Sequence, residues 1–185
     1  MTIMKKFVIL LILAISYNIM QAQELTKKEL KVAKRELESK KDSISSIIAK
    51  DAMEKGEWIF NAATITVSGG AMNTVPANLN FLMVEGEQFT FQTSTGFGGG
   101  PNNMGGITTT GLIKIESVDI DRHGNTSYYM KLTGSILNAS ATLNLQRNSN
   151  MADLYLNMDR GARNISMTGS IYPIGSTNVF EGSIR

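Results

Sequence analysis

The chain lacks cysteine, and among its 185 residues it has a single histidine, His123. Without cysteine it can form no disulfide, thiolate metal site or thiol nucleophile, so its fold must be stabilised by burial of the core alone. With one histidine, most acid–base schemes lack an imidazole, and a Ser/His/Asp arrangement would depend on His123 alone. The sequence therefore favours a protein that is not an enzyme, and nothing in it indicates a cofactor.

The chain also lacks an excess of positive charge. It has 18 Lys and Arg against 16 Asp and Glu, and two of the lysines, Lys5 and Lys6, lie in a hydrophobic leader, which leaves 16 charges of each sign in the remainder. Nucleic-acid binding requires a clustered excess of Lys and Arg that displaces counterions. We therefore expect no nucleic-acid partner.

The first 22 residues have the order of a secretion signal. Two lysines precede a 14-residue run of mostly Ile, Leu, Val and Ala, from Phe7 to Met20, and the small residue Ala22 follows. This pattern predicts cleavage after Ala22 and export to the periplasm or the medium. A membrane anchor is the alternative, but the run is shorter than the roughly 20 residues that span a bilayer. We therefore expect no integral membrane protein. Because no cysteine is present to carry a lipid, we also expect no lipoprotein.

Two zones of different composition follow the leader. Residues 23–56 hold 16 charged residues in 34 positions, whereas residues 57–185 hold 16 in 129, and all 17 glycines lie at or after Gly56. A charged zone without internal glycine, followed by a chain rich in turns, predicts a helix and then a β-domain. The expected organisation is a signal peptide at 1–22, a charged amphipathic helix at 23–56 and an antiparallel β-domain at 57–185.

The charged zone has the pattern of one amphipathic helix. Thr26 and Glu29 match a capping box, which predicts that the helix begins there, and Gly56 provides a stop. Three roles of the apolar face are open: packing on the chain's own domain, binding to a partner or a coiled-coil helix, and lying on a membrane surface. We favour the first, because the charges are balanced and the face has no large aromatic residue. The residues of this face are Leu30, Ala33, Leu37, Ile44, Ile47, Ile48 and Ala52.

After Gly56 the apolar period changes from about 3.6 to 2, which is typical of half-buried strands. A change of phase before Val118 predicts a β-bulge near Ser117. Short connections predict an antiparallel meander of about eight strands, closed as a small lipocalin-like barrel or collapsed as a sandwich. An outer-membrane barrel has the same alternation, but short strands and few aromatic residues disfavour it. The expected strands are Trp58–Val67, Leu79–Glu85, Gln88–Gln92, Ile107–Asp121, Tyr128–Thr133, Ala139–Gln146, Leu154–Met158 and Ile165–Ile171, with a possible ninth at Val179–Ile184.

Several segments of the mature chain carry a resemblance to a known family. They are Trp58-Ile59-Phe60 after the charged helix and residues 80–86, 98–106, 141–145 and 163–169, together with Gly111 ahead of a strand. In these segments the chain resembles the domain of unknown function 4251 family, a family of secreted Bacteroidetes proteins. The resemblance implies a secretion signal and a barrel or sandwich of the lipocalin-like class. It implies no activity and no catalytic or binding residues.

Three polar segments were compared with known sites. The glycine loop at 95–106 lacks the Gly-Lys-Ser/Thr ending of a phosphate-binding loop and precedes no helix, so we expect a long hairpin loop or a lid over one end of a barrel. Asp119, Asp121, His123 and Asn125 match the first half of a calcium loop, but Met130 stands where a bidentate Glu is needed, which favours a solvated turn. Glu85 and Glu87 flank a hairpin glycine, where nothing would give the two carboxylates different environments.

A pocket under the glycine loop is the remaining candidate site. Met130 and Met167 provide adaptable apolar walls, and the small residues Ala139 and Ala141 could leave space at one end of a barrel. The sequence therefore favours an exported noncatalytic β-domain that acts through protein or cell-envelope contacts. The alternative is a lipocalin-like binder of a small apolar ligand. The residues assigned to the pocket or its lid are Gly98, Gly99, Gly100, Pro101, Met130, Ala139, Ala141 and Met167.

Overall fold

The computed structural model describes residues 2–67, 70, 72–94, 107–158 and 164–179, with side chains described from Thr26 onward. The chain divides into two compact units, Met1–Lys41 and Asp42–Arg185. The second unit contains every strand of the described residues and the last turns of the helix that precedes them.

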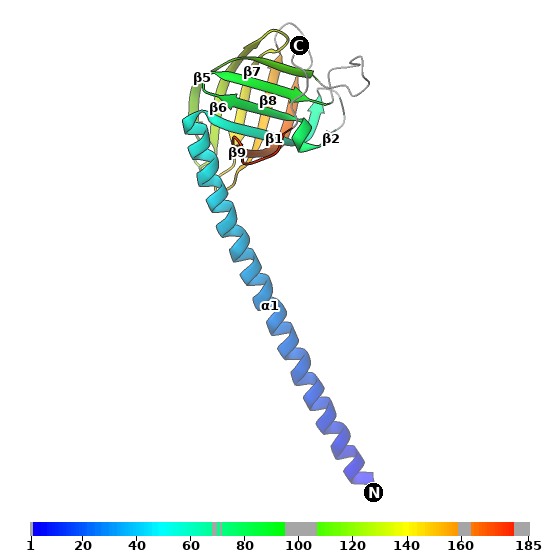
Figure 1. The fold of residues 1–185 in the computed structure, drawn as a ribbon. Coiled ribbons are helices and arrows are strands. Elements are labelled where there is room, and N and C mark those ends of the chain that lie inside the picture. Colours follow the sequence, from blue (N-terminus) through cyan, green and yellow to red (C-terminus); the bar gives the residue numbers. More distant parts are fainter. Residues whose placement is uncertain (1, 68–69, 71, 95–106, 159–163, 180–185) are drawn as a thin grey trace. The chain divides into compact units, whose positions relative to one another are not determined.

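Helix α1 spans Thr2–Lys55 (Figure 1). The prediction that it begins at the Thr26 capping box is wrong: the leader is rich in Ile, Leu, Met and Ala, residue types that a helix accepts, and the helix continues through Thr26. The predicted end is confirmed. Gly56 has a φ of +68° and its amide donates to the carbonyl of Met53 at 3.1 Å, which closes the last turn as a glycine following a helix commonly does.

The strands match the sequence pattern closely. All eight expected strands are present among the described residues, and a short additional strand, β2, was not predicted. Of the possible ninth strand at Val179–Ile184, all but Val179 lies outside the described residues. The strands are β1 (Glu57–Val67), β2 (Met72–Thr74), β3 (Phe81–Glu85), β4 (Gln88–Thr93), β5 (Ile107–Ile120), β6 (Thr126–Gly134), β7 (Asn138–Leu145), β8 (Met151–Met158) and β9 (Ile165–Pro173), with a 3-10 turn at Ala77–Leu79.

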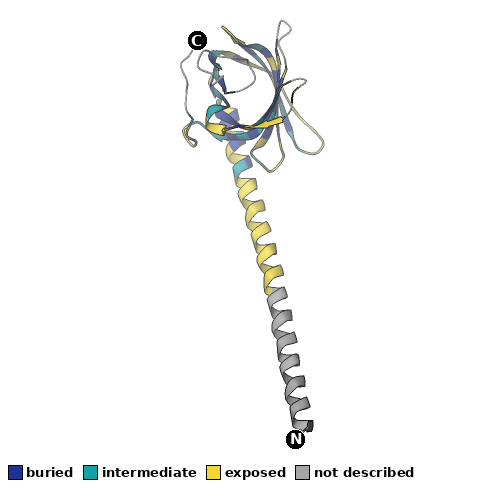
Figure 2. Ribbon diagram, turned by 90° about the vertical axis from the view of Figure 1, so that its right-hand side faces the viewer, coloured by how far each residue is buried: buried dark blue, intermediate teal, exposed yellow. Residues whose placement is uncertain are grey.

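The sheet closes into a barrel. Successive strands pair antiparallel in the order β2-β1-β3-β4-β5-β6-β7-β8-β9, and β1 also pairs with β9. That last pairing runs from Trp58↔Pro173 to Val67↔Ile165, so β1 and β3 to β9 form a closed ring of eight strands (Figure 2). Closure resolves the choice between barrel and sandwich, and it leaves the ring with no first or last strand whose edge is unpaired.

A bulge in β5 explains the change of phase seen in its sequence. The register with β6 shifts between Ile115 and Ser117, as predicted. Before the bulge Ile115 pairs with Met130, and after it Val118 pairs with Tyr128. Directly paired residues point to the same face of a sheet, so the extra residue keeps both apolar sets on one face.

The barrel interior is lined by alternate residues of each strand. Trp58 and Phe60 from β1 and Phe89 and Phe91 from β4 are the largest of these side chains, and each is at most 1% exposed. Two sites of close approach use glycine: Gly169 of β9 lies against the backbone of β1, and Gly111 of β5 lies beneath the Phe89 ring. The buried cluster continues through Ile65, Leu82, Val84, Met130, Leu132, Ala139, Ala141, Leu143, Leu145, Ala152, Leu154, Leu156, Ile165, Met167 and Ile171.

The last turns of α1 pack on the barrel through a face other than the predicted one. Ser46, Ala49, Ala52 and Met53 are buried, and the last three belong to the same apolar cluster as the barrel interior. Three of these four residues, Ser46, Ala49 and Ala52, have small side chains. Within the second unit, the expectation that the apolar face packs on its own domain is therefore wrong for Ile44, Ile47 and Ile48 and holds for Ala52. The large members remain exposed, at 73% for Leu30, 69% for Leu37, 59% for Ile44, 68% for Ile47 and 47% for Ile48.

Candidate functional site in the barrel interior and at its rim

The four predicted pocket residues that the structure describes all lie inside the barrel. Met130, Ala139, Ala141 and Met167 are each at most 2% exposed. Met130 and Ala141 are direct partners between β6 and β7, and Met167 pairs with Leu154 between β9 and β8. The predicted lid residues Gly98, Gly99, Gly100 and Pro101 lie outside the described residues.

Among the side chains that the structure describes, two polar atoms in this interior have no hydrogen-bond partner. They are the indole nitrogen Nε1 of Trp58 and the hydroxyl Oγ1 of Thr109. Both residues are fully buried: Trp58 belongs to the apolar cluster, and Thr109 pairs directly with Phe91, another member. A buried polar group without a partner is uncommon and costs free energy, so these two atoms are the chemically distinctive points of an otherwise apolar interior.

A polar cluster that the sequence reasoning missed holds Ser94, the residue directly before the glycine loop. Asn80 is fully buried, and its Nδ2 donates to the carbonyl of Pro76 at 2.8 Å and to Oγ of Ser94 at 2.9 Å. Its Oδ1 accepts from the amide of Ser94 at 2.8 Å and from Oγ1 of Thr93 at 3.2 Å. One side chain thus fixes the segment before β3 and the last residue described before the glycine loop. Its signal in the sequence was an asparagine directly before an apolar strand.

A second pair of polar side chains extends this cluster to β5. Oγ1 of Thr108 donates to Oε1 of Gln92 at 2.8 Å, and Nε2 of Gln92 donates to the carbonyl of Leu79 at 3.3 Å. Both side chains are largely buried. The residues on either side of the glycine loop are therefore joined by amide and hydroxyl groups, which hold structure and have no titratable member.

In the turn that resembles the first half of a calcium loop, the Asp121 carboxylate accepts hydrogen bonds from residues of the same turn. The carboxylate of Asp121 accepts from the amides of His123 at 2.8 Å and Asn125 at 2.9 Å, and from Nδ2 of Asn125 at 2.8 Å. These hydrogen bonds, first of all those from Asn125, hold the pKa of Asp121 below its usual 3.8. Among the described residues no group of three His, Asp or Glu side chains is placed to hold a metal ion. Asp121 therefore stabilises the β5–β6 turn.

Glu85 and Glu87 lie where the sequence places them, exposed on either side of Gly86. A surface hollow of about 310 Å³ is lined by Glu57, Glu85, Gly86 and Ile174. Within it, Glu57 of β1 is the direct partner of Glu85 of β3. Because Glu85 and Glu87 are both exposed, water screens their charges. The two carboxylates therefore share one kind of environment, which gives them no different chemical roles.

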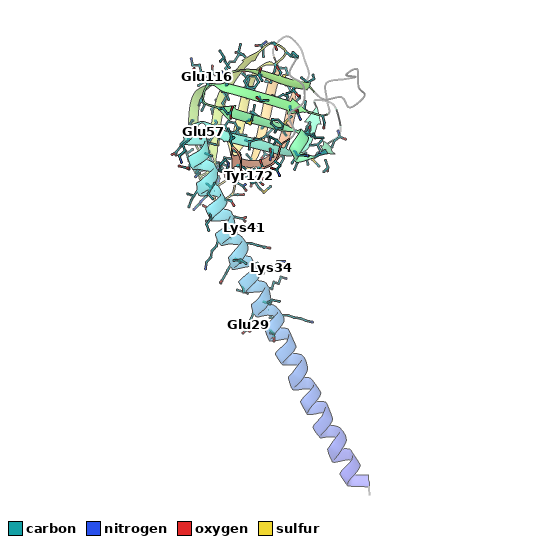
Figure 3. The ribbon with its side chains drawn as sticks, in the orientation of Figure 1. Glu29, Lys34, Lys41, Glu57, Glu116 and Tyr172 are labelled. Atoms are coloured by element: carbon teal, nitrogen blue, oxygen red, sulfur yellow. The ribbon has the colours of Figure 1, made fainter. Side chains whose placement is uncertain are left out.

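The far half of β5 leaves apolar residues uncovered at the barrel rim. The pairing of β4 with β5 ends at Gln88↔Leu112, so residues 114–120, named here the β5 overhang, have a strand on one edge alone among the described residues. Ile115, Val118 and Ile120 share a face with the buried residues of β6 and yet are 44%, 51% and 66% exposed. Figure 3 marks Glu116 within this segment.

The structure defines the class of protein: a closed eight-stranded antiparallel barrel, with buried interior side chains, preceded by a helix whose last turns pack on it. The family model named Domain of unknown function (DUF4251) matches residues 40–171, and the chain belongs to this family. The family suggested by the sequence is thereby confirmed, and of the two architectures expected, barrel and sandwich, the structure shows the barrel.

A solved structure shares this architecture. The crystal structure of a DUF4251 family protein from Bacteroides eggerthii DSM 20697, at 1.95 Å resolution, is 25% identical to this chain. The two structures align with a TM-score of 0.65, over 78% of this chain and 98% of that one. No curated protein matches the chain. Among the residues that the structure describes, no helix is long and apolar enough to cross a membrane.

Proposed function

We propose that the protein is an exported, noncatalytic β-barrel that acts by binding another protein of the cell envelope. The observation that carries this proposal is the β5 overhang, which combines an unpaired strand edge with three exposed apolar side chains, Ile115, Val118 and Ile120. An exposed edge accepts an additional strand through main-chain hydrogen bonds, and neighbouring apolar side chains add affinity. A partner segment in extended conformation fits both features.

Two further observations support the other parts of the proposal. The leader has the basic start, apolar run and small residue at Ala22 that export requires. Asp121, whose turn invited comparison with a calcium loop, caps that turn instead. The buried Asn80 likewise holds structure, by binding Ser94 directly before the glycine loop. We therefore infer that the protein acts through contacts at the β5 overhang and catalyses no reaction.

Site-specific photo-crosslinking in the exporting cell tests the contact. A photoreactive amino acid at Ile120 is expected to give one defined protein adduct, and the same amino acid at Tyr155, which is 47% exposed on β8, is the matched control and should not give it. The additional change Val118→Asp should abolish the adduct by placing a charge on the apolar face. An adduct equally strong from both positions, or none from Ile120, contradicts the proposal.

Export is tested separately by the N-terminal mass of the protein recovered from the periplasm or the medium. The expected N-terminus lies near Gln23. Recovery of a chain that keeps Met1 and stays in the cytoplasm contradicts this part, whatever the crosslinking shows.

Ligand binding is the second candidate function, favoured by the unpartnered Trp58 Nε1 and Thr109 Oγ1 inside the barrel. Native mass spectrometry of the purified protein would show a bound small molecule as an added mass. Ala141 lies between Met130 and Leu156 and is 2% exposed, so Ala141→Trp should plug a pocket without loss of stability if space exists there. If the interior is already full, the same change should destabilise the fold by about 1–3 kcal/mol. No added mass together with a lowered melting temperature removes this candidate.

A further inference from the structure

The charged part of α1 has an exposed heptad pattern. Leu30, Leu37 and Ile44 recur every seven residues, and Ala33 and Ile47 follow two of them by three residues. In the lettering of a coiled coil, these are a and d positions. Leu30, Leu37, Ile44 and Ile47 are between 59% and 73% exposed, and Figure 2 shows this stretch of the helix as exposed. Residues at this spacing lie along one face of a helix and form a seam for a second helix.

The charges beside this seam show what would cover it. In the same lettering, Glu29 and Glu36 occupy g positions, and Lys34 and Lys41 occupy e positions (Figure 3 marks three of the four). All four are exposed, and among the described side chains none of them makes an ion pair within the chain. The seam is therefore acidic along one flank and basic along the other.

We propose that α1 pairs in parallel with α1 of a second copy of this chain through this seam. In a parallel pair each g residue faces the e residue of the following heptad on the other helix, so Glu29 meets Lys34 of the second copy and Glu36 meets its Lys41. All four contacts generated by the twofold axis then join opposite charges. In an antiparallel pair, e faces e and g faces g, so Lys would face Lys and Glu would face Glu. The charges thus select both the partner and its direction.

The seam also favours two strands. Lys40 occupies a d position between Leu37 and Ile44, and its ammonium group must reach water. In a two-stranded coil a lysine stem can lie along the seam while its charge remains at the edge, whereas three or four helices would enclose it. The apolar stretch spans about three heptads, which is short, so we expect a dimer that forms and dissociates with protein concentration.

The dimer is tested by sedimentation of the protein as purified from the exporting cell, over a wide concentration range. The wild type should show a monomer–dimer equilibrium. Leu37→Asp places a carboxylate in the seam and should raise the dimer dissociation constant by about tenfold or more. Val32→Asp is the matched control, because Val32 is 53% exposed on α1 and lies at a c position, away from the seam. Unchanged melting of both variants shows that the barrel is folded.

The direction of pairing is tested with cysteine, because the chain has none of its own. In a parallel pair Ala33→Cys lies directly opposite its own copy and should form an intermolecular disulfide under mild oxidation, whereas Val32→Cys should not. Reversal of the four flank charges in one variant, with Glu29 and Glu36 changed to Lys and Lys34 and Lys41 changed to Glu, should preserve the dimer. Reversal of the two lysines alone should weaken it.

A protein that sediments as a monomer at every concentration overturns the proposal. So does an equal effect of Leu37→Asp and Val32→Asp, and a failure of Ala33→Cys to crosslink more than Val32→Cys overturns the parallel direction. This inference depends on the helix alone and goes beyond the function proposed above. Its failure leaves the crosslink from the β5 overhang unaffected, and a failure of that crosslink leaves the dimer unaffected.

Discussion

The closure of the barrel depends on a glycine with no room for a side chain. Gly169 pairs with Ala62 where β9 meets β1, next to the register shift between Ala62 and Thr64. A Cβ atom built on Gly169 would lie 2.1 Å from the carbonyl oxygen of Asn61 and 2.9 Å from Cα of Ala62. Both contacts are with backbone, which cannot move aside as a flexible side chain can. Gly169→Ala must therefore push β1 and β9 apart at the seam that closes the ring.

The size of the effect follows from this geometry. Forcing one additional carbon into a tightly packed site typically costs about 1–3 kcal/mol, and we expect Gly169→Ala to lie near the upper end because the neighbours are main-chain atoms. For a domain of this size each kcal/mol lowers the melting temperature by about 2–4 °C. A loss of about 2–3 kcal/mol therefore corresponds to a decrease of about 4–12 °C.

Urea unfolding and a thermal melt, both followed by far-UV circular dichroism, measure this change. Ser170→Ala, at the adjacent position of β9, is the control, because it adds no atom and should change the free energy of unfolding by less than about 0.5 kcal/mol. If Gly169→Ala is as stable as Ser170→Ala, the backbone of β1 is not held as close to β9 as the register requires, and the reasoning on closure is wrong.

Three other predictions concern the polar cluster, the buried tyrosine of β6 and the domain boundary. Asn80→Ala removes the groups that bind Ser94 and Pro76, and it should lower the free energy of unfolding by about 1–3 kcal/mol in urea titrations; an unchanged midpoint would contradict the role of Asn80. Burial, and secondly the charge of Glu54, raise the pKa of Tyr128 above its usual 10.0, so the protein should lose stability as the pH rises through the folded-state pKa. Tyr128→Phe should reduce this alkaline loss in melts at increasing pH, and equal losses would refute it. A chain that begins at Asp42, the first residue of the second compact unit, should keep a cooperative melt, and loss of the strands would refute this.

The local pattern of the sequence was sufficient for the strands. Apolar and polar residues alternate with period two wherever one face of a strand is buried, so the ends of β4, β7 and β9 were predicted to within two residues. The same alternation located the bulge near Ser117, because one inserted residue changes the phase. These signals depend on neighbours in the chain, and a sequence displays them directly.

The helix face was predicted wrongly because hydrophobicity alone does not decide burial. Ile44, Ile47 and Ile48 are more apolar than Ser46 and Ala49, but the structure buries the small residues and exposes the isoleucines. The choice depends on which face of the helix is turned toward the barrel, and the periodicity of the helix does not contain that information. In this case the error is informative, because it leaves exposed the face that we propose to pair with a second copy of the chain.

The sequence by itself determined the fold class, the strand positions and the absence of cysteine chemistry, since each follows from composition or from local period. Only the tertiary structure decided that the sheet closes through β1 and β9, that Asn80 binds Ser94 fourteen residues later, and that β5 extends beyond β4. These features depend on atoms that are distant in the chain and meet only when packing fixes the register. Local propensities leave such meetings open, because the free energy that selects them comes from burial and from hydrogen bonds across the whole barrel.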